Sequence, residues 1–214
     1  MRNLAEDREI MLSRDLEGRG IADPKVLEAM RAVPREEFVP AELKDQAYRD
    51  YPLPIDEGQT ISQPYIVAYM AECLELSSAD RVLEIGTGSG YSAAVLSRIA
   101  AQVFSVERFA SLAQSAGERL RRLGYDNIRI HVGDGTLGWL EHAPYDAIIV
   151  TAGAPKVPKP LLEQLAGGGR LLLPVGPDRL GQTLIRVRRV DVNEYREERL
   201  LAVQFVPLVG AEGW

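Results

Sequence analysis

Hydrophobic residues in the middle of the chain fall into short apolar runs that alternate with stretches of helical periodicity. The apolar runs end at glycine or charged residues, which is typical of buried strands, and the stretches between them repeat apolar positions at helical spacing. We expect strands at 81–85, 103–106, 128–132, 147–150 and 170–174, and helices at 64–76, 92–100, 110–123 and 160–165. This alternation predicts a Rossmann-like, doubly wound α/β fold, in which helices cover both faces of a mostly parallel sheet.

Both ends of the chain depart from this alternation. Before residue 33, apolar positions recur at helical spacing around the Asp23-Pro24 pair, which is typical of a helix start, so we expect two short helices. Residues 33–64 are rich in proline, tyrosine and acids and predict a winding segment with little regular structure. Near the C-terminus, the runs 183–190 and 201–207 are rich in β-forming residues, and the charged segment between them indicates a β-hairpin.

Length and composition narrow the class of protein. The 214 residues, 46% of them hydrophobic and 26% charged, fit a single globular domain. We divide this domain, residues 1–214, into an N-terminal helical and loop extension (1–63), a core (64–182) and a C-terminal β-rich tail (183–214). The net charge of -6 argues against broad electrostatic attraction to the phosphates of nucleic acid.

The sequence also carries indications of where the protein works. No apolar run reaches the roughly 18–20 residues that cross a bilayer, and residues 1–14 lack the apolar block of a secretory signal. The single cysteine, Cys73, cannot form an internal disulfide, and such a chain suits a reducing compartment. We expect a cytoplasmic protein without a membrane or nucleic-acid partner. The sequence does not fix the oligomeric state, although we favour a monomer.

A glycine-rich turn follows the first strand of the core. Gly86, Gly88 and Gly90 stand at alternate positions before a predicted helix. Such a loop lets a ligand approach the backbone closely and presents amide donors at a helix N-terminus. Tyr91 occupies the place of the third glycine in the dinucleotide fingerprint, so a nicotinamide cofactor is disfavoured. Taken alone, the loop could be a simple strand-to-helix turn.

Acidic residues at the next two strand ends favour nucleoside binding. Glu107 ends the second strand, roughly twenty residues beyond the glycine loop, where a carboxylate can accept hydrogen bonds from both ribose hydroxyls. Asp134 follows the third strand and could accept from the exocyclic amine of adenine, while Gly135 permits close approach of the ring. Either acid alone is more often a helix cap or a solvated charge. Because the three features lie in order at strand C-termini, we expect them to converge on one nucleoside.

The glycine loop carries a family resemblance. Residues 82–91, Val-Leu-Glu-Ile-Gly-Thr-Gly-Ser-Gly-Tyr, resemble motif I of class I S-adenosylmethionine methyltransferases, and 145–150 and 165–171 resemble later motifs of that superfamily. The resemblance implies that S-adenosyl-L-methionine is the cofactor and that 64–182 is the nucleotide-binding core. It also implies that Glu84 lies below the loop and holds either the loop or the methionine end of the cofactor. The alternative is that Glu84 only braces the loop.

The segment before motif I indicates the methyl acceptor. Residues 58–68, Gly-Gln-Thr-Ile-Ser-Gln-Pro-Tyr-Ile-Val-Ala, closely resemble the hallmark of the protein-L-isoaspartate O-methyltransferase family. The resemblance extends over nearly the whole chain and includes 35–40, 51–55, 151–155 and 205–208. It implies methylation of the free α-carboxylate of L-isoaspartyl residues in damaged proteins and peptides, giving an ester that closes to a succinimide and so permits repair.

Ser62 is the candidate catalytic residue by this resemblance. An α-carboxylate, with a reference pKa of about 3.3–3.7, is ionised at pH 7, so the reaction requires alignment and desolvation more than a strong base. The Ser62 hydroxyl can fix one carboxylate oxygen without adding charge, and it could also cap the helix that follows. Neither His131 nor His142 lies in a motif that would form a nucleophile triad with Ser62, and we interpret both as surface or strand-end imidazoles.

The resemblance implies further contacts around the two ligands. Residues of the hallmark segment would line the mouth of the site, Thr60 on the cofactor side and Gln63, Pro64 and Tyr65 on the substrate side. An apolar stretch near the C-terminus would hold the substrate backbone, although it could equally be core: Val206, Pro207 and Leu208. No metal site is expected. Two departures from the family pattern are Asp56-Glu57, where a glycine-containing pair is frequent, and Gly153, where alanine is frequent.

Three alternatives remain open at this stage. The first is a class I methyltransferase acting on a different small-molecule or protein acceptor, or on nucleic acid. Methylation of base amino groups usually accompanies an Asn/Asp-Pro-Pro-aromatic motif, whereas this chain has Thr-Ala-Gly-Ala-Pro at 151–155. The second is a non-catalytic nucleoside-binding module, which the Ser62 segment argues against. The third is a nicotinamide oxidoreductase, which Tyr91 disfavours.

Overall fold

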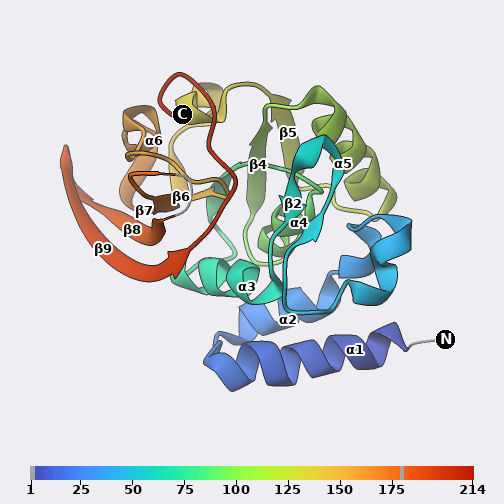
Figure 1. Ribbon diagram of the computed structural model, residues 1–214. Coiled ribbons are helices and arrows are strands. Elements are labelled where there is room, and N and C mark those ends of the chain that lie inside the picture. The colour runs from blue at the N-terminus through green and yellow to red at the C-terminus, as the bar shows by residue number, and fades with distance from the viewer. Residues whose placement is uncertain (1–2, 179–180) are drawn as a thin grey trace.

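A single twisted sheet forms the centre of the molecule (Figure 1). The computed structural model describes residues 3–178 and 181–214. In spatial order, the strands of the sheet are β5 (Ile128–Val132), β4 (Gln102–Glu107), β3 (Arg81–Ile85), β6 (Tyr145–Val150), β7 (Leu165–Val175), β8 (Gln182–Asp191) and β9 (Glu194–Val203). The pairs from β5 to β7 are parallel, whereas β8 and β9 are antiparallel. The prediction of a mostly parallel, doubly wound sheet with a C-terminal hairpin is confirmed.

Helices precede the sheet and connect its strands. The N-terminal extension contains α1 (Leu4–Ile10), which continues through a π-helical stretch (Met11–Leu16), and then α2 (Pro24–Ala32). The core contains α3 (Pro64–Cys73), α4 (Tyr91–Ser97), α5 (Ala110–Arg122) and α6 (Lys159–Glu163). Short 3-10 turns lie at Glu17–Arg19, Arg35–Glu37, Ala41–Gln46, Asp56–Gly58, Gly135–Leu137 and Leu140–His142. The winding segment also contains a small antiparallel pair, β1 (Leu53–Pro54) and β2 (Thr60–Ile61).

Side chains alternate between the two faces of the sheet, and both faces are covered. Val82 of β3 and Ala147 of β6 belong to the apolar cluster that contains the buried residues of α2, α3 and α4. Their neighbours Leu83 and Ile148 belong to a second cluster with Leu161 of α6. In Figure 1, α6 lies above the sheet and α1 to α3 lie below it. Burial on both faces explains why these parallel strands are continuous apolar runs.

The C-terminal hairpin differs from the prediction. The charged segment expected to connect two strands forms the first half of β9, and the predicted strand 201–207 is wrong beyond Val203. A tight turn of Val192 and Asn193 joins β8 to β9, with Asn193 in the left-handed region at φ 60°. β9 is an edge strand, where charged side chains remain solvated and discourage pairing with another chain, so charge was a poor sign of a loop here.

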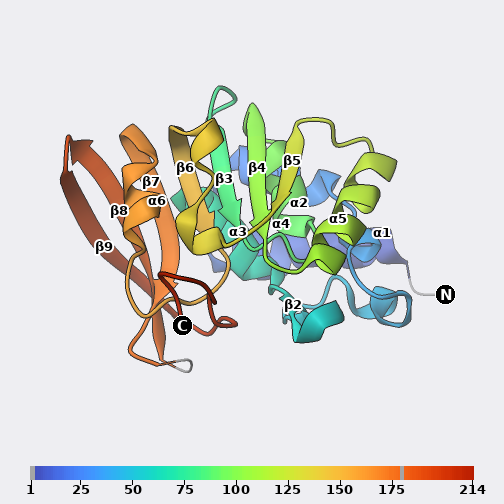
Figure 2. The same ribbon diagram turned by 90° about the horizontal axis from the view of Figure 1, so that it is seen from above.

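Other element boundaries differ by a few residues. β7 begins at Leu165 rather than at residue 170, and its glycines lie beside an irregularity in the pairing with β6. At Gly169 a Cβ would lie 2.9 Å from the Ala166 carbonyl oxygen, so the strand crowds its own backbone there and accepts only glycine. Figure 2, turned from the first view, shows β7, β8 and β9 together at one end of the sheet.

Within the described residues, no helix is both long and apolar enough to span a membrane.

The turn between β8 and β9 generates a stability prediction. Asn193→Val should lower the free energy of unfolding by about 1 kcal/mol, because a β-branched residue is strained at positive φ, whereas Asn193→Gly should change it by only a few tenths. Urea denaturation would measure both variants. Glu194→Val, one residue further along at ordinary φ, is the matched control. Equal losses in the two valine variants would contradict the left-handed turn.

Candidate active site

A cavity of about 680 Å³ opens where the strand order reverses, at the C-terminal ends of β3, β4 and β6. Its volume lies within the range of roughly 300–1,000 Å³ typical of ligand pockets. Three further segments complete its wall: residues 59–63, which we call the pre-α3 loop, the first turns of α3, and residues 202–209 near the C-terminus. The cavity therefore lies at the place that the switch-point rule predicts for a nucleoside.

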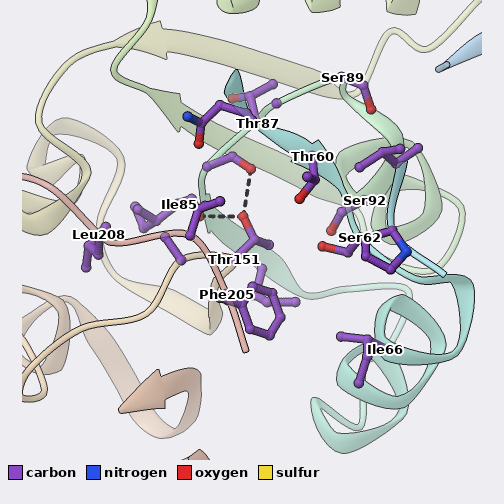
Figure 3. A pocket seen from close by; sticks show the side chains of 18 of the residues that line it. Thr60, Ser62, Ile66, Ile85, Thr87, Ser89, Ser92, Thr151, Phe205 and Leu208 are labelled. Atoms are coloured by element: carbon purple, nitrogen blue, oxygen red, sulfur yellow. Dashed lines mark hydrogen bonds between the residues drawn. The ribbon is translucent and has the colours of Figure 1, made fainter. Parts of the chain in front are cut away.

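The glycine loop is fastened to the end of β6. Gly86 has φ 98°, and a Cβ at this position would lie 2.4 Å from Oγ1 of Thr151. The Thr151 hydroxyl lies 3.0 Å from the carbonyl oxygens of both Ile85 and Gly86, to which it can donate (Figure 3). Gly86 and Gly88 line the cavity, whereas Gly90 packs against Leu120 of α5 outside it. Two of the three predicted glycines thus face the cavity, and the third supports the start of α4.

Glu107 lies in the cavity wall at the end of β4. Its side chain is buried, and its two oxygens accept hydrogen bonds from the backbone N–H groups of Gly88 at 2.9 Å and Phe109 at 3.0 Å. Each carboxylate oxygen has a second lone pair, so the group can hold the glycine loop and still accept from a ligand. Glu107 thus lies where a ligand in the cavity would meet it, and its contact with ribose stays a prediction.

Glu84 lies on β3, fully buried and outside the lining of the cavity. The Ser105 hydroxyl donates to Oε2 of Glu84 at 2.5 Å, and Ser105 is in turn 2.6 Å from the Thr87 hydroxyl of the glycine loop. Oε1 has no hydrogen-bond partner among the described residues. The pKa of Glu84 is raised from 4.5 to about 7, chiefly by burial and also by the charge of Glu107, against the opposing effect of the Ser105 and Ser92 hydroxyls.

Asp134 holds the C-terminal segment. Its carboxylate accepts from the backbone N–H and the hydroxyl of Thr136 at 2.9 and 2.7 Å, and from the Ala211 N–H at 2.8 Å. Burial raises the pKa of Asp134, but these hydrogen bonds together lower it below its ordinary value. Asp134 does not line the cavity, whereas Gly135 does, and a Cβ at Gly135 would lie 2.4 Å from Ile85. The contact of Asp134 with adenine therefore stays a prediction.

Ser62 presents its side chain to the cavity from the pre-α3 loop. The residue is half-buried and its hydroxyl makes no hydrogen bond to a described residue, while its backbone carbonyl accepts from Arg35 at 2.8 Å. In Figure 3 its oxygen is directed into the same space as that of Ser92. The expectation that Ser62 could cap the next helix is wrong, because Gln63 is the N-cap position and a carboxylate oxygen of Asp50 accepts the Tyr65 N–H at 3.0 Å.

The predicted substrate residues of the hallmark segment divide into two groups. Thr60 and Gln63 line the cavity, although the Gln63 amide also donates to the carboxylate of Asp50 at 2.7 Å. Pro64 is buried and Tyr65 packs between Arg19, 3.5 Å from its ring centroid, and Tyr69. Neither Pro64 nor Tyr65 lines the cavity, so their predicted contact with substrate stays a prediction. They fix the start of α3 behind it.

The C-terminal candidates are held by the end of β6. Val206, Pro207 and Leu208 line the cavity. The Gly153 N–H donates to the Val206 carbonyl at 2.8 Å, and the Leu208 N–H donates to the Gly153 carbonyl at 2.7 Å. A Cβ at Gly153 would lie 2.3 Å from the Gln182 amide, which explains the departure from alanine here. The other departure, Glu57, adopts φ 57°, in the left-handed region that favours the glycine frequent at this place.

Sequence reasoning missed much of the remaining lining. The unpredicted lining includes an apolar wall, Ile66, Val67, Met70 and Phe205, and the polar residues Ser92, Arg108 and Thr151. The apolar residues were indistinguishable from helix core, because a ligand wall and a packed core have the same side chains. Thr151 lay in a segment already noted for its resemblance, and its hydroxyl at a strand end was a usable signal.

The histidines and the cysteine lie apart from Ser62. His131 is exposed on β5 and stacks on Trp139 at 4.9 Å, while His142 packs against Phe104 at 4.6 Å. Neither lines the cavity, and Cys73 is a half-buried free thiol on α3. The described part of the chain contains no group of three or more His, Cys, Asp or Glu residues placed to hold a metal ion.

Comparisons with known proteins agree on one family. A family model described as protein-L-isoaspartate(D-aspartate) O-methyltransferase (PCMT) matches residues 6–213. The chain is 67% identical over 214 residues to protein-L-isoaspartate O-methyltransferase 2 of Pelobacter propionicus, covering 100% of this chain and 95% of that protein. It is 66% identical over 214 residues to protein-L-isoaspartate O-methyltransferase 1 of Geotalea uraniireducens, covering 100% of this chain and 98% of that protein.

A solved structure supports the same relationship at the level of the fold. The structure is a protein-L-isoaspartate O-methyltransferase from Plasmodium falciparum in complex with S-adenosyl-L-homocysteine. It is similar to this chain with a TM-score of 0.82 at 28% sequence identity, covering 98% of this chain and 99% of that one. The similarity therefore includes the N-terminal extension and the C-terminal hairpin as well as the core.

Burial of Glu84 generates a pH prediction that needs no ligand. Because its pKa is raised to about 7, the folded chain keeps a proton that the unfolded chain loses above 4.5. The free energy of unfolding should therefore fall as pH rises from 4.5 to 7, by about 3 kcal/mol from this group. Glu84→Gln removes the titration, so the variant should gain stability relative to the parent between pH 5 and pH 8. The prediction is contradicted if the free energies of unfolding of the parent and of Glu84→Gln change with pH by the same amount.

Proposed function

Because the chain belongs to the protein-L-isoaspartate(D-aspartate) O-methyltransferase family, we propose residue roles for the reaction of that family in the cavity beside Ser62. The protein transfers a methyl group from S-adenosyl-L-methionine to the free α-carboxylate of L-isoaspartyl residues in damaged proteins and peptides. The resulting ester starts repair through a succinimide. The observation that carries the residue roles is a cavity-facing hydroxyl beside a glycine loop at the strand-order reversal.

The cofactor side of the cavity fits a cationic nucleoside. Glu107 would accept the ribose hydroxyls, with Gly86 and Gly88 allowing close approach of the backbone. The unpartnered Oε1 of Glu84 is a buried acceptor below the glycine loop, which suits the methionine end of the cofactor. When bound, S-adenosyl-L-methionine supplies an electrophilic methyl group on a sulfonium sulfur. Further contacts are assigned to Thr60, Gly90, Asp134 and Gly135, of which Gly90 and Asp134 would act from outside the lining.

The acceptor side requires alignment rather than a base. The isoaspartyl carboxylate is already ionised at pH 7, so no group has to remove a proton. The Ser62 hydroxyl, which makes no hydrogen bond within the described chain, donates to one carboxylate oxygen and leaves the other as the nucleophile. Ile66 and Phe205 provide an apolar wall that excludes water from the carboxylate. Positioning and desolvation together lower the barrier.

The C-terminal segment would hold the substrate backbone. Val206, Pro207 and Leu208 line the cavity opposite the pre-α3 loop, and an extended peptide can lie between them. Gln63 contributes from the loop side. Pro64 and Tyr65 are assigned an indirect role, because both lie behind the loop and support it.

We also propose that the chain acts as one domain and as a monomer in the cytoplasm. One apolar cluster contains buried residues of both the N-terminal extension and the core, which supports a single domain. Charges of both signs on edge strand β9, including Arg196, Glu197 and Arg199, oppose association of sheets from two chains. The single thiol, Cys73, suits a reducing compartment.

The role of Ser62 can be tested with a pair of peptides that differ only in an aspartyl or isoaspartyl linkage. With labelled S-adenosyl-L-methionine, base-labile label should enter the isoaspartyl peptide alone. Ser62→Ala should lower kcat by about ten- to hundredfold, the value of one hydrogen bond to a charged group. Its affinity for S-adenosyl-L-homocysteine should change by less than about threefold. Ser13→Ala, at an exposed serine, is the control. Unchanged kcat in Ser62→Ala would refute the assignment.

The cofactor roles can be separated by comparing two carboxylates. Glu107→Gln should weaken binding of S-adenosyl-L-homocysteine by about ten- to hundredfold, because an amide replaces a charged acceptor in the cavity wall. Asp134→Asn should weaken it less, since Asp134 lies outside the lining. Isothermal titration calorimetry would measure both affinities, with thermal unfolding as the check on folding. An effect of Asp134→Asn as large as that of Glu107→Gln would support a direct contact of Asp134 with adenine.

A further inference from the structure

Arg35 is a fully buried cation without a counter-ion. It begins the 3-10 turn Arg35–Glu37 and forms no ion pair with any residue in the described part of the chain. Its Nε donates to the Ala47 carbonyl at 2.7 Å and its Nη2 to the Ser62 carbonyl at 2.8 Å, while Nη1 has no hydrogen-bond partner. Burying an unpaired charge is costly, so such a group needs a reason.

A second arginine, Arg170, also donates to backbone carbonyls but has an acidic partner. Arg170 on β7 is also largely buried and donates to the carbonyls of Leu74, Glu75 and Asp146. It also forms an ion pair with Asp80 at 2.8 Å, and both side chains are 12% exposed. Arg170 therefore braces the end of α3 with its charge neutralised. Arg35 also donates to backbone carbonyls, but no carboxylate in the described part of the chain pairs with its charge.

Arg35 links the loop that presents Ser62 to two other parts of the fold. The guanidinium carbon lies 4.7 Å from the centroid of the Tyr91 ring, at the start of α4. One side chain thus joins the N-terminal extension, the pre-α3 loop and the helix that follows the glycine loop. Because Nη2 holds the Ser62 carbonyl, the peptide unit that carries the cavity-facing hydroxyl is fixed from behind.

The charges around Arg35 leave a net positive charge behind Ser62. The carboxylate whose charge acts on Arg35 is that of Asp50, but Asp50 pairs with Arg19 at 2.6 Å and accepts the Tyr65 N–H. The other groups that act on it are the buried tyrosines Tyr48 and Tyr91, and burial raises the pKa of each, which keeps both neutral. Arg19, Asp50 and Arg35 together therefore carry one uncompensated positive charge.

We infer that Arg35 is a positioning residue for the acceptor. The donors of its planar guanidinium, which we call the fork, hold the Ser62 carbonyl, and its unpaired charge favours an anionic group at the Ser62 hydroxyl. This inference rests on the proposed role of Ser62. It gives the site a preference for a carboxylate over a neutral acceptor without placing a cation in contact with the substrate. A direct contact with Arg or Lys would place a strong hydrogen bond on the nucleophilic carboxylate oxygens. A buried charge behind the Ser62 peptide attracts the carboxylate without forming that bond.

Two substitutions separate the fork from the charge. Arg35→Lys keeps the charge but loses the fixed pair of donors, so kcat should fall about tenfold while KM for the isoaspartyl peptide stays within about threefold. Arg35→Gln keeps a donor but loses the charge, so KM should rise about tenfold or more. Both variants should bind S-adenosyl-L-homocysteine within about threefold of the parent. Arg170→Gln is the matched control, with lower thermal stability but unchanged KM and kcat.

The outcomes distinguish this inference from the proposed function. If Ser62→Ala lowers kcat but both Arg35 variants match Arg170→Gln, the inference about Arg35 is wrong and the role of Ser62 stands. If Ser62→Ala has no effect, the proposed function of Ser62 fails first. Should Arg35→Gln not fold, Tyr91→Leu removes the aromatic contact while keeping the charge, and it should lower kcat without raising KM. A rise in KM for Tyr91→Leu equal to its fall in kcat would overturn the separation of fork and charge.

Discussion

The turn after β3 is held between the ends of β4 and β6, and the rest of the site depends on this arrangement. The Gly86 N–H donates to the Val106 carbonyl of β4, and the Thr151 N–H donates to the Ile85 carbonyl, each at 2.9 Å. At a reversal of strand order, the connections leave a central strand in opposite directions and open a crevice. The hydrogen bonds keep the glycine loop in that crevice, so Glu107 and Thr151 reach it from the two neighbouring strands.

The two ends of the chain complete a site that the core begins. The N-terminal extension supplies Arg35 behind the pre-α3 loop, and the C-terminal segment is bound through Gly153 and Asp134. Lys156 adds an ion pair to Glu212 at 2.9 Å, with both groups partly exposed and thus a small contribution. Segments remote in sequence face one another across the cavity because each is tied to the end of a strand or to the start of a helix.

Local pattern predicted the core well and the ends less well. The alternation around 81–150 predicts strands buried on both faces. The glycine at position 86 likewise predicts a turn in which another group comes close to the backbone. The hairpin was misplaced, because solvated charge on edge strand β9 resembles a loop when its neighbours are unknown. Arg35 lies in segment 35–40, which carries part of the resemblance, but its role was not predictable, because its partners are twenty-seven and fifty-six residues away and only the folded chain brings them together. The resemblance identified Ser62, but not the residue that fixes it.

Two incompletely satisfied ionisable groups lie behind the cavity wall, and they carry opposite charges when ionised. Glu84 has an unpartnered oxygen below the glycine loop, and Arg35 has an unpartnered nitrogen behind Ser62. In the proposed reaction, a sulfonium cation and a carboxylate anion become a neutral thioether and a neutral ester. The Glu84 carboxylate, once ionised above its pKa of about 7, and the Arg35 guanidinium therefore favour the charged reactants over the products. Interactions stronger in the ground state than in the transition state do not accelerate the chemical step. In the proposed mechanism, the two buried groups therefore favour capture of reactants and release of products, and acceleration comes from the alignment by Ser62 and the apolar wall beside it.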